Sequence, residues 1–152
     1  MTKVNLDKLQ AKSNGNIESV VASVEMKNGA LIALGTQVAG ERELLNVLAP
    51  AKDKELLLVA VPEVKYDESL DQLDMSIQAG KPMRAFHLTV GDKFQVERSL
   101  FAAAPKVGDI VTGNATYGYA VNVDSRTTFI VEELTKFDYD QREMALLRVL
   151  TV

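Results

Sequence analysis

The sequence predicts a mainly β protein, folded as a small β-barrel or sandwich-like domain with one short α-helix and an extended N-terminal arm. Short apolar segments recur about every ten residues along the 152-residue chain. Clusters of Gly, Asn, Asp and Lys separate them and are typical of turns. The apolar fraction of 47% is high enough for a buried core. We therefore expect an arm over residues 1–16 and a single β-rich domain over 17–152.

The N-terminal segment has two interpretations. Val4, Leu6 and Leu9 are separated by polar residues, and a turn-type cluster follows at residues 13–16. The segment is either a frayed terminus or an arm that becomes ordered on a partner, with Val4 and Leu6 on one side of an added strand.

The first half of the domain contains four predicted strands. Alternation of apolar and polar residues over 20–26 predicts the first one. Asn-Gly within residues 27–29 separates it from the apolar run 30–35. Because both residues tolerate a positive φ, this pattern predicts a β-hairpin. Two further strands are expected over 44–48 and 55–61, each followed closely by a proline.

The one predicted helix covers residues 69–79. Ser69 and Gln72 match a capping box at its start, and Gly80 matches a left-handed stop. The apolar stripe expected to dock on the sheet consists of Leu70, Leu73 and Ile77.

The second half returns to β patterns. Strands are expected over residues 86–90, 93–97, 117–123, 127–137 and 144–152. The tripeptide Val-Gly-Asp occurs at residues 90–92 and again at 107–109. We expect both copies to be turns that lead into strands.

Composition leaves few routes to catalysis. The chain has no cysteine, which excludes disulfides and thiolate metal sites, and His87 is its single histidine. Because His87 is out of phase with the apolar residues around it, we expect it to face away from their core. A catalytic histidine would need an orienting carboxylate and a nucleophile, and no Gly-x-Ser-x-Gly motif is present. We therefore expect no enzymatic activity, no metal and no cofactor.

Charge and hydropathy limit the classes of partner that the chain is expected to bind. A formal net charge of −4 does not favour nucleic-acid binding. The N-terminus lacks the apolar segment of a signal peptide, and the longest aliphatic run, residues 56–61, is too short for a membrane helix. We expect synthesis in the cytoplasm and no membrane partner.

One aromatic set could form a binding face. Tyr117 and Tyr119 alternate on a predicted strand, and Phe129 lies on the next. Aromatic side chains can stack on sugars or bases, whereas cross-strand packing is the structural alternative.

Several segments together resemble a known group of proteins. They are residues 4–9, 15–20, 40–44 and 79–94. In these segments the chain resembles small capsid decoration or auxiliary (head) structural proteins of tailed bacteriophages.

The resemblance implies a virion structural protein on the outer capsid surface. Such a protein would bind the lattice of the major capsid protein and other copies of itself, as a trimer or dimer. It implies that the arm, through Val4, Leu6 and Leu9, adds an edge strand to a capsid subunit. The alternative function is a β-barrel ligand- or carbohydrate-binding module of the virion, with a pocket at Tyr117, Tyr119 and Phe129.

Overall fold

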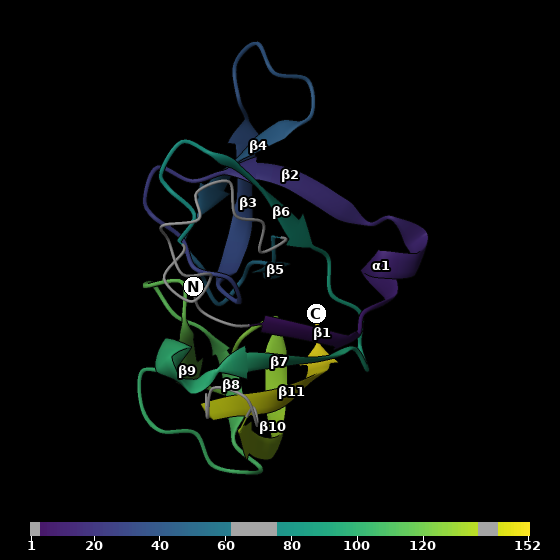
Figure 1. Ribbon diagram of the computed structural model, residues 1–152, viewed down its shortest axis with the longest axis vertical. Helices are drawn as coiled ribbons and strands as arrows, with labels where there is room; N and C mark the ends of the chain where they lie inside the picture. The colour runs from purple at the N-terminus through teal and green to yellow at the C-terminus, as the bar shows by residue number, and fades with distance from the viewer. Residues whose placement is uncertain (1–3, 62–75, 137–142) are drawn as a thin grey trace, which may run out of the picture.

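The computed structural model describes residues 4–61, 76–136 and 143–152, and it confirms a mainly β fold. Two β units stack on one another, a closed five-stranded barrel and a six-stranded antiparallel sheet (Figure 1). The predicted choice between barrel and sandwich therefore resolves as a barrel packed on a sheet. None of the helices described is long and apolar enough to cross a membrane.

The barrel is formed by a contiguous part of the chain. Its strand order is β2-β4-β3-β5-β6, with β2 and β4 parallel and every other pair antiparallel. The strands are β2 (Ile17–Val21), β3 (Leu31–Gln37), β4 (Leu44–Leu48), β5 (Leu57–Val59) and β6 (Pro82–Phe86). The barrel interior is filled by Val20, Ala22, Met26, Ala30, Ile32, Leu57, Val59, Ile77, Met83 and Ala85.

The six-stranded sheet combines both ends of the chain, in the order β1-β7-β11-β10-β8-β9. Its strands are β1 (Val4–Lys8), β7 (Lys93–Glu97), β8 (Ile110–Gly113), β9 (Tyr119–Val121), β10 (Thr128–Lys136) and β11 (Glu143–Thr151). A short helix α1 (Gln10–Asn14) links β1 to the barrel, and a 3-10 helix η2 (Arg98–Leu100) follows β7.

A second core joins the two units, and β5 contributes to both cores. Leu57 and Val59 point into the barrel, whereas Leu56, Leu58 and Ala60 pack between barrel and sheet. A strand that is buried on both faces needs a continuous apolar run, which accounts for residues 56–61.

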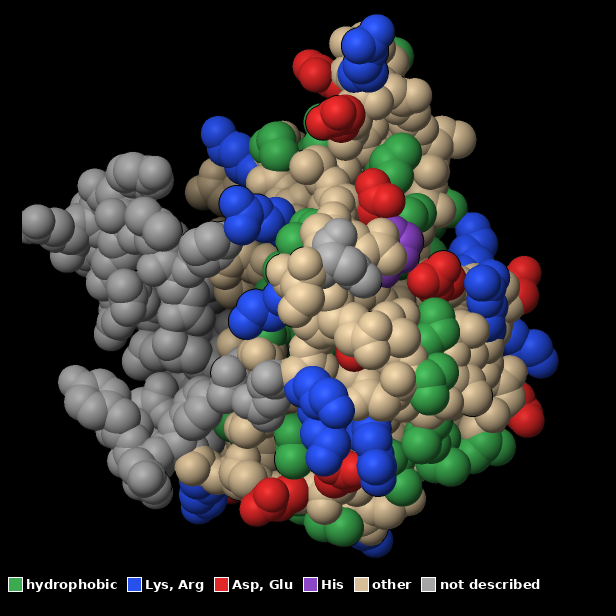
Figure 2. Space-filling view, turned by 90° about the vertical axis from the view of Figure 1, so that its right-hand side faces the viewer, with side chains coloured by type: hydrophobic (Ala, Val, Ile, Leu, Met, Phe, Trp, Pro, Cys, Tyr) green, Lys and Arg blue, Asp and Glu red, His purple; other side chains and the backbone are tan. Residues whose placement is uncertain are grey.

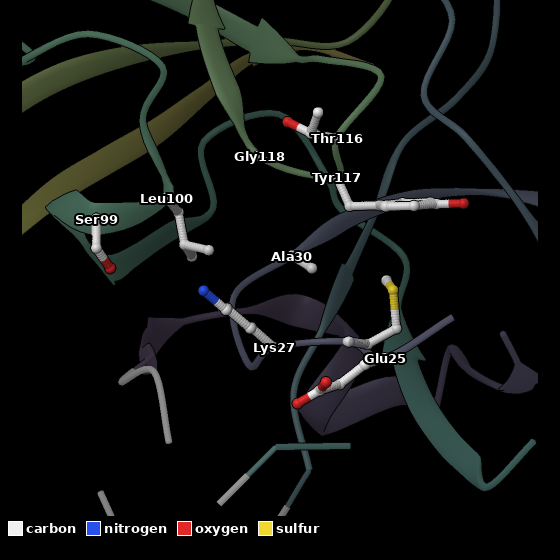
Figure 3. Close-up of a pocket in the computed structure, with 9 residues that line it drawn as sticks. Glu25, Lys27, Ala30, Ser99, Leu100, Thr116, Tyr117 and Gly118 are labelled. Carbon is white, nitrogen blue, oxygen red and sulfur yellow. The ribbon is translucent and has the colours of Figure 1, made fainter. Parts of the chain in front are cut away.

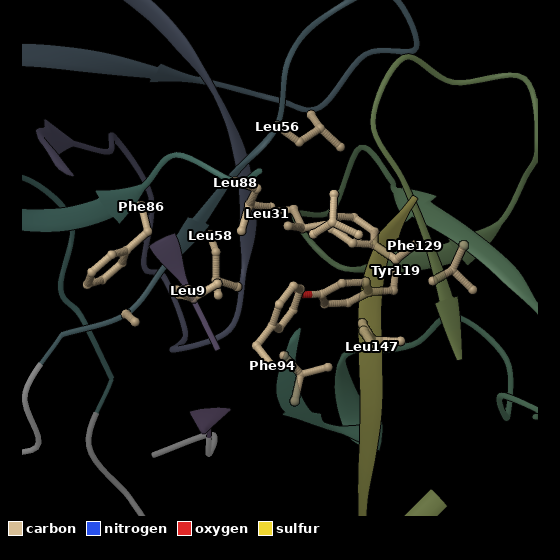
Figure 4. Packing of buried hydrophobic residues seen from close by; sticks show 14 of the residues in the cluster. Leu9, Leu31, Leu56, Leu58, Phe86, Leu88, Phe94, Tyr119, Phe129 and Leu147 are labelled. Carbon is tan, nitrogen blue, oxygen red and sulfur yellow. The ribbon is translucent and has the colours of Figure 1, made fainter. Parts of the chain in front are cut away.

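Aromatic residues of the sheet form the centre of this second core (Figure 4). Phe94 and Phe129 meet edge to face, with ring centroids 5.5 Å apart, and Tyr119 meets Phe129 at 6.2 Å. Such geometries favour aromatic pairs beyond their burial alone. We call the apolar cluster between barrel and sheet the interface core.

The predicted hairpin at residues 27–29 is wrong. The turn itself forms, since Ala30 N donates to Lys27 O (3.1 Å), but β2 and β3 are not neighbours in the barrel. The buried Asn28 side chain instead pairs with the backbone of Val61, accepting from its N–H (2.9 Å) and donating to its carbonyl (3.1 Å). These bonds dock the turn on the chain beyond β5 rather than between two paired strands.

The predicted helix over 69–79 is not found in the part that can be compared. Residues 69–75 lie outside the described residues. Ile77 forms an extended bridge with Met26 through two backbone hydrogen bonds of 2.8 and 2.9 Å, which a helix would not allow. The observed α-helix, α1, lies instead in the predicted arm and ends at Gly15, whose φ is 73°.

The strand expected over 86–90 begins earlier than predicted. β6 covers Pro82–Phe86, with proline at the first position, where a missing N–H is tolerated. Val90 lies beyond it in a turn and is 60% exposed.

Candidate functional site

The predicted arm is part of the folded unit. β1 pairs with β7 in the sheet, and Leu9 is buried with 6% exposure. Val4 and Leu6 are partly buried and pack on the interface core. Residues 4–14 therefore differ from the expected arm, because their apolar side chains are used within the chain itself.

Asp92 anchors this N-terminal segment. One carboxylate oxygen accepts from Gln10 N (3.3 Å) at the start of α1, and the other accepts from Thr89 N (2.9 Å). The aspartate is 1% exposed, so both of its contacts are shielded from water. Deleting the segment would thus remove an edge strand and a buried anchor together.

The predicted aromatic face is also corrected, since Tyr119 and Phe129 are both 0% exposed. The Tyr119 hydroxyl donates to Gly29 O (2.7 Å), and its ring stacks on Phe101 at 5.0 Å. Burial raises the pKa of the Tyr119 phenol well above its usual value. Tyr119 is thus a structural link from sheet to barrel and is not available to a ligand.

Tyr117, the third predicted residue, has a different environment. Among the described residues it is the one non-glycine with a positive φ, at 63°. This conformation costs a bulky residue about 1–2 kcal/mol, so the surroundings must hold it in place. Its ring is half-buried and lines a cleft between barrel and sheet (Figure 3).

Three segments far apart in sequence form this cleft, which we call the Tyr117 cleft. The barrel contributes the connection between β2 and β3, and the sheet contributes η2 and the turn between β8 and β9. Its volume is about 240 Å³. The lining residues are Glu25, Met26, Lys27, Ala30, Ser99, Leu100, Thr116, Tyr117 and Gly118.

Asn114 holds the turn that carries Tyr117. Its Oδ1 accepts from Thr116 N (3.0 Å), Thr116 Oγ1 (2.7 Å) and Gly118 N (3.0 Å). The backbone of Tyr117 is fixed on both sides, because its N–H donates to Asn114 O and its carbonyl accepts from Leu31 N, each at 3.1 Å. The aromatic wall of the cleft is therefore preorganised.

Close backbone packing fixes the cleft where the turn meets η2. A Cβ at Gly118 would lie 2.3 Å from the carbonyl oxygen of Leu100. A Cβ at Gly29 would lie 3.0 Å from Leu100 Cδ1. Glycine at these positions lets the barrel and the sheet approach η2.

His87 lies between two carboxylates. Its Nε2 is 3.1 Å from Glu18 Oε1 and its Nδ1 is 3.3 Å from Glu55 Oε1. Arg126 approaches the other oxygen of Glu55 at 4.0 Å. The histidine is tied to two acids, and it crosslinks β2 to the segment before β5. No group of three or more metal-ligating side chains occurs in the described ranges.

The two Val-Gly-Asp turns are confirmed and have the same geometry. We call residues 89–92 turn 1 and residues 106–109 turn 2. In each, the first N–H donates to the aspartate Oδ2 (2.9 Å in both), and the aspartate N–H donates back to the first carbonyl (3.0 and 3.1 Å). The central glycines have φ values of 92° and 93°. The valines at the tips are exposed by 60% and 64%.

The turns are related by a pseudo-two-fold axis between β10 and β11. The glycine N–H and aspartate carbonyl of turn 1 pair with Val149 (3.0 and 2.9 Å), and those of turn 2 pair with Val131 (2.8 and 2.9 Å). The register obeys the same symmetry, since Phe129 pairs with Val149 while Val131 pairs with Leu147. Turn 1 precedes β7 and turn 2 precedes β8. Because β7 and β8 flank the central β11-β10 pair and run in opposite directions, the turns lie on opposite sides of this pair and point in opposite directions along it.

Comparisons with protein-family models, with curated proteins and with solved structures give no significant match for this chain.

Proposed function

We propose that this protein is a virion structural protein that decorates and stabilises the icosahedral head of a tailed bacteriophage by binding the lattice of the major capsid protein. The resemblance in residues 4–9, 15–20, 40–44 and 79–94 motivates the proposal. The structural observation that carries it is the pair of equivalent turns, which present Val90 and Val107 as exposed apolar tips on opposite sides of the central β10-β11 pair.

Two equivalent contact points suit a partner that is itself repeated. A capsid lattice offers the same surface many times, related by local symmetry axes. A sheet with pseudo-two-fold symmetry can place the same turn against two neighbouring subunits. Engaging both subunits makes the second contact intramolecular, so two weak contacts give a strong joint affinity.

Each turn is suited to docking without rearrangement. The aspartate of the turn locks the backbone, and the glycine N–H is already paired with the sheet. A rigid apolar tip loses little conformational entropy on binding. Burying one valine contributes about 1.5 kcal/mol, or roughly tenfold in affinity.

A charged hairpin tip provides a second kind of contact. The loop between β3 and β4, residues 38–43, projects from the barrel (Figure 1). Acidic and basic side chains gather at this tip (Figure 2), which contains Glu41, Arg42 and Glu43. Gln37 Nε2 braces the loop by donating to Glu41 O (2.8 Å). Such charges orient a partner more than they add affinity.

Decoration would stabilise the head by mass action. A protein that binds the expanded lattice and not the immature one lowers the free energy of the expanded form. Contacts between neighbouring copies, as a dimer or trimer, would add to this effect.

The test is binding of purified protein to expanded heads that lack it, measured by co-sedimentation and by mass. We expect saturable binding at a fixed number of copies per head, and at least a tenfold loss of affinity in the double variant Val90→Ser/Val107→Ser. Val24→Ser, at a 44% exposed valine outside the turns, is the matched control. Absence of binding by the unmodified protein would refute decoration, and full affinity of the double variant would refute docking through the turns.

A further inference from the structure

The Tyr117 cleft lies apart from turn 1 and turn 2 and is lined by other residues. We propose that the Tyr117 cleft binds one sugar ring of a saccharide, which stacks on the Tyr117 side chain, accepts a hydrogen bond from Lys27 and donates hydrogen bonds to Glu25 and to the hydroxyl oxygens of Thr116 and Ser99.

The Tyr117 ring forms a fixed aromatic wall of the cleft. A positive φ at a tyrosine is costly, yet the Asn114 turn fixes it with hydrogen bonds on both sides of the residue. One part of the ring packs on the barrel core, and the side chain also lines the cleft. An aromatic ring held in place in this way is a stacking platform for the apolar face of a ring-shaped ligand.

The polar groups around the ring provide both donors and acceptors. Lys27 donates and Glu25 accepts, and neither forms an ion pair with any other residue that the structure describes. The hydroxyls of Thr116 and Ser99 donate hydrogen bonds to Asn114 Oδ1 (2.7 Å) and Glu97 Oε1 (3.0 Å). Each hydroxyl oxygen can still accept a hydrogen bond from a ligand in the cleft. Sugar hydroxyls both donate and accept and can satisfy all of these groups.

Charge and size narrow the ligand class further. The lining contains one cation and one anion, so no net positive charge attracts a phosphate group. The volume of about 240 Å³ lies below the range of roughly 300–1,000 Å³ of drug-sized pockets, which indicates a ligand about one ring in size. A mixed apolar and hydroxyl-rich ring fits this combination, whereas a nucleotide does not.

The geometry also predicts the strength of binding. One ring with a few hydrogen bonds gives a dissociation constant in the millimolar range. This last step rests on the proposed function: many copies on one decorated head would engage a polymeric saccharide together, and the joint affinity would exceed that of one cleft.

The experiment is a titration of the full chain with neutral methyl hexosides and methyl N-acetylhexosaminides, followed by amide chemical shifts in NMR. We expect saturable shifts at residues 25–30 and 116–118. Replacing Tyr117→Asn removes the ring while keeping a residue that tolerates a left-handed backbone, and should weaken binding roughly tenfold. Lys27→Met, at an exposed residue that packing does not constrain, should weaken it about tenfold as well. Lys52→Met, at an exposed lysine outside the cleft lining, is the matched control and should bind normally.

Three outcomes would overturn the proposal. The first is that no glycoside shifts the cleft amides up to its solubility limit. The second is unchanged affinity in Tyr117→Asn, or in Lys27→Met if the tyrosine variant does not fold. The third is an equal response to acetate alone, which would reveal a bare anion contact at Lys27. Because the titration uses no phage heads, its result is separate from the test of capsid binding.

Discussion

The hydrogen bond between Tyr119 and Gly29 allows a sharp test of how barrel and sheet are joined. Tyr119→Phe removes one oxygen from a side chain that is 0% exposed and leaves Gly29 O without this 2.7 Å partner. An unsatisfied buried acceptor costs about 1–3 kcal/mol. We expect a loss near 2 kcal/mol in the free energy of unfolding, which corresponds to about 4–8 °C in Tm for a chain of this size.

Tyr117→Phe is the matched control. It makes the same chemical change two residues earlier, at a half-buried ring whose hydroxyl forms no hydrogen bond with another described residue. We expect its effect to stay within about 0.5 kcal/mol. Urea unfolding followed by circular dichroism measures both variants. Equal losses in the two would refute the assignment of the Tyr119 bond as a link between the units.

The Tyr119→Phe variant should also differ from the unmodified protein in how its stability depends on pH. Burial raises the pKa of Tyr119 in the folded state above that of the unfolded chain, which is about 10. The folded state therefore holds this proton more tightly, and its stabilising effect is complete below pH 10 and is lost as pH rises above it. Above this pH the free energy of unfolding of the unmodified protein falls by up to about 1.4 kcal/mol per pH unit. Tyr119→Phe has no phenol at this position and does not show this decrease. The stability gap between the two proteins should thus narrow above pH 10, and a gap independent of pH would contradict the burial of the phenol.

Further substitutions test the cleft, the N-terminal anchor and the histidine. Gly118→Ala should destabilise the fold by at least 2 kcal/mol because its Cβ would meet a backbone oxygen at 2.3 Å, whereas Gly40→Ala, with nothing within 4 Å, should cost about 1 kcal/mol for its φ alone; equal Tm losses would contradict the close approach. Asp92→Ala should cost about 2 kcal/mol and abolish protection of the β1 amides in hydrogen exchange, while Asp109→Ala in turn 2 should leave β1 protected. His87→Ala should cost about 1 kcal/mol or less, because Glu18 and Glu55 beside it are each about one-third exposed. The variant leaves these two like charges without the imidazole between them, so adding Glu18→Gln should recover part of the loss in urea unfolding, and no recovery would contradict repulsion between the acids.

The local sequence pattern correctly predicted the elements whose backbone conformation is not altered by contacts with distant parts of the chain. Strand 44–48 and strand 93–97 were placed at the observed bounds, and the repeated Val-Gly-Asp was assigned to turns. The turn bonds span only three residues, and the strands were located from their own apolar residues and the turn residues beside them, although their pairing partners in β2 and β11 lie far away in the sequence. The apolar run at 56–61 predicted a buried strand, yet burial on both faces depends on a sheet that comes much later in the sequence.

Long-range contacts explain the failures. Asn28-Gly29 is a strong hairpin signal, but the Asn28 amide finds its partners 33 residues away at Val61. Closure of the barrel then pairs β2 with β4 in parallel, an arrangement that no local pattern encodes.

One residue explains why the aromatic site was predicted in part only. Strict alternation places Tyr117 and Tyr119 on the same face, but the left-handed backbone of Tyr117 breaks the alternation. One ring therefore lines the cleft while the other enters the interface core. Lys27 and Ser99 join Tyr117 from segments with no shared signal, so the cleft itself could not be predicted from the sequence.

The path of the chain has a consequence for synthesis. The barrel is complete once the ribosome has passed β6, whereas β1 waits for β7 and the sheet stays unfinished until β11, the final strand, emerges. During that interval the outward apolar side chains of the barrel, among them Leu31, Leu56 and Leu58, have no cover. We expect a nascent chain that stops before β10 to expose this apolar surface to solvent and to other chains. Truncation near the C-terminus should therefore yield aggregation rather than a smaller soluble protein.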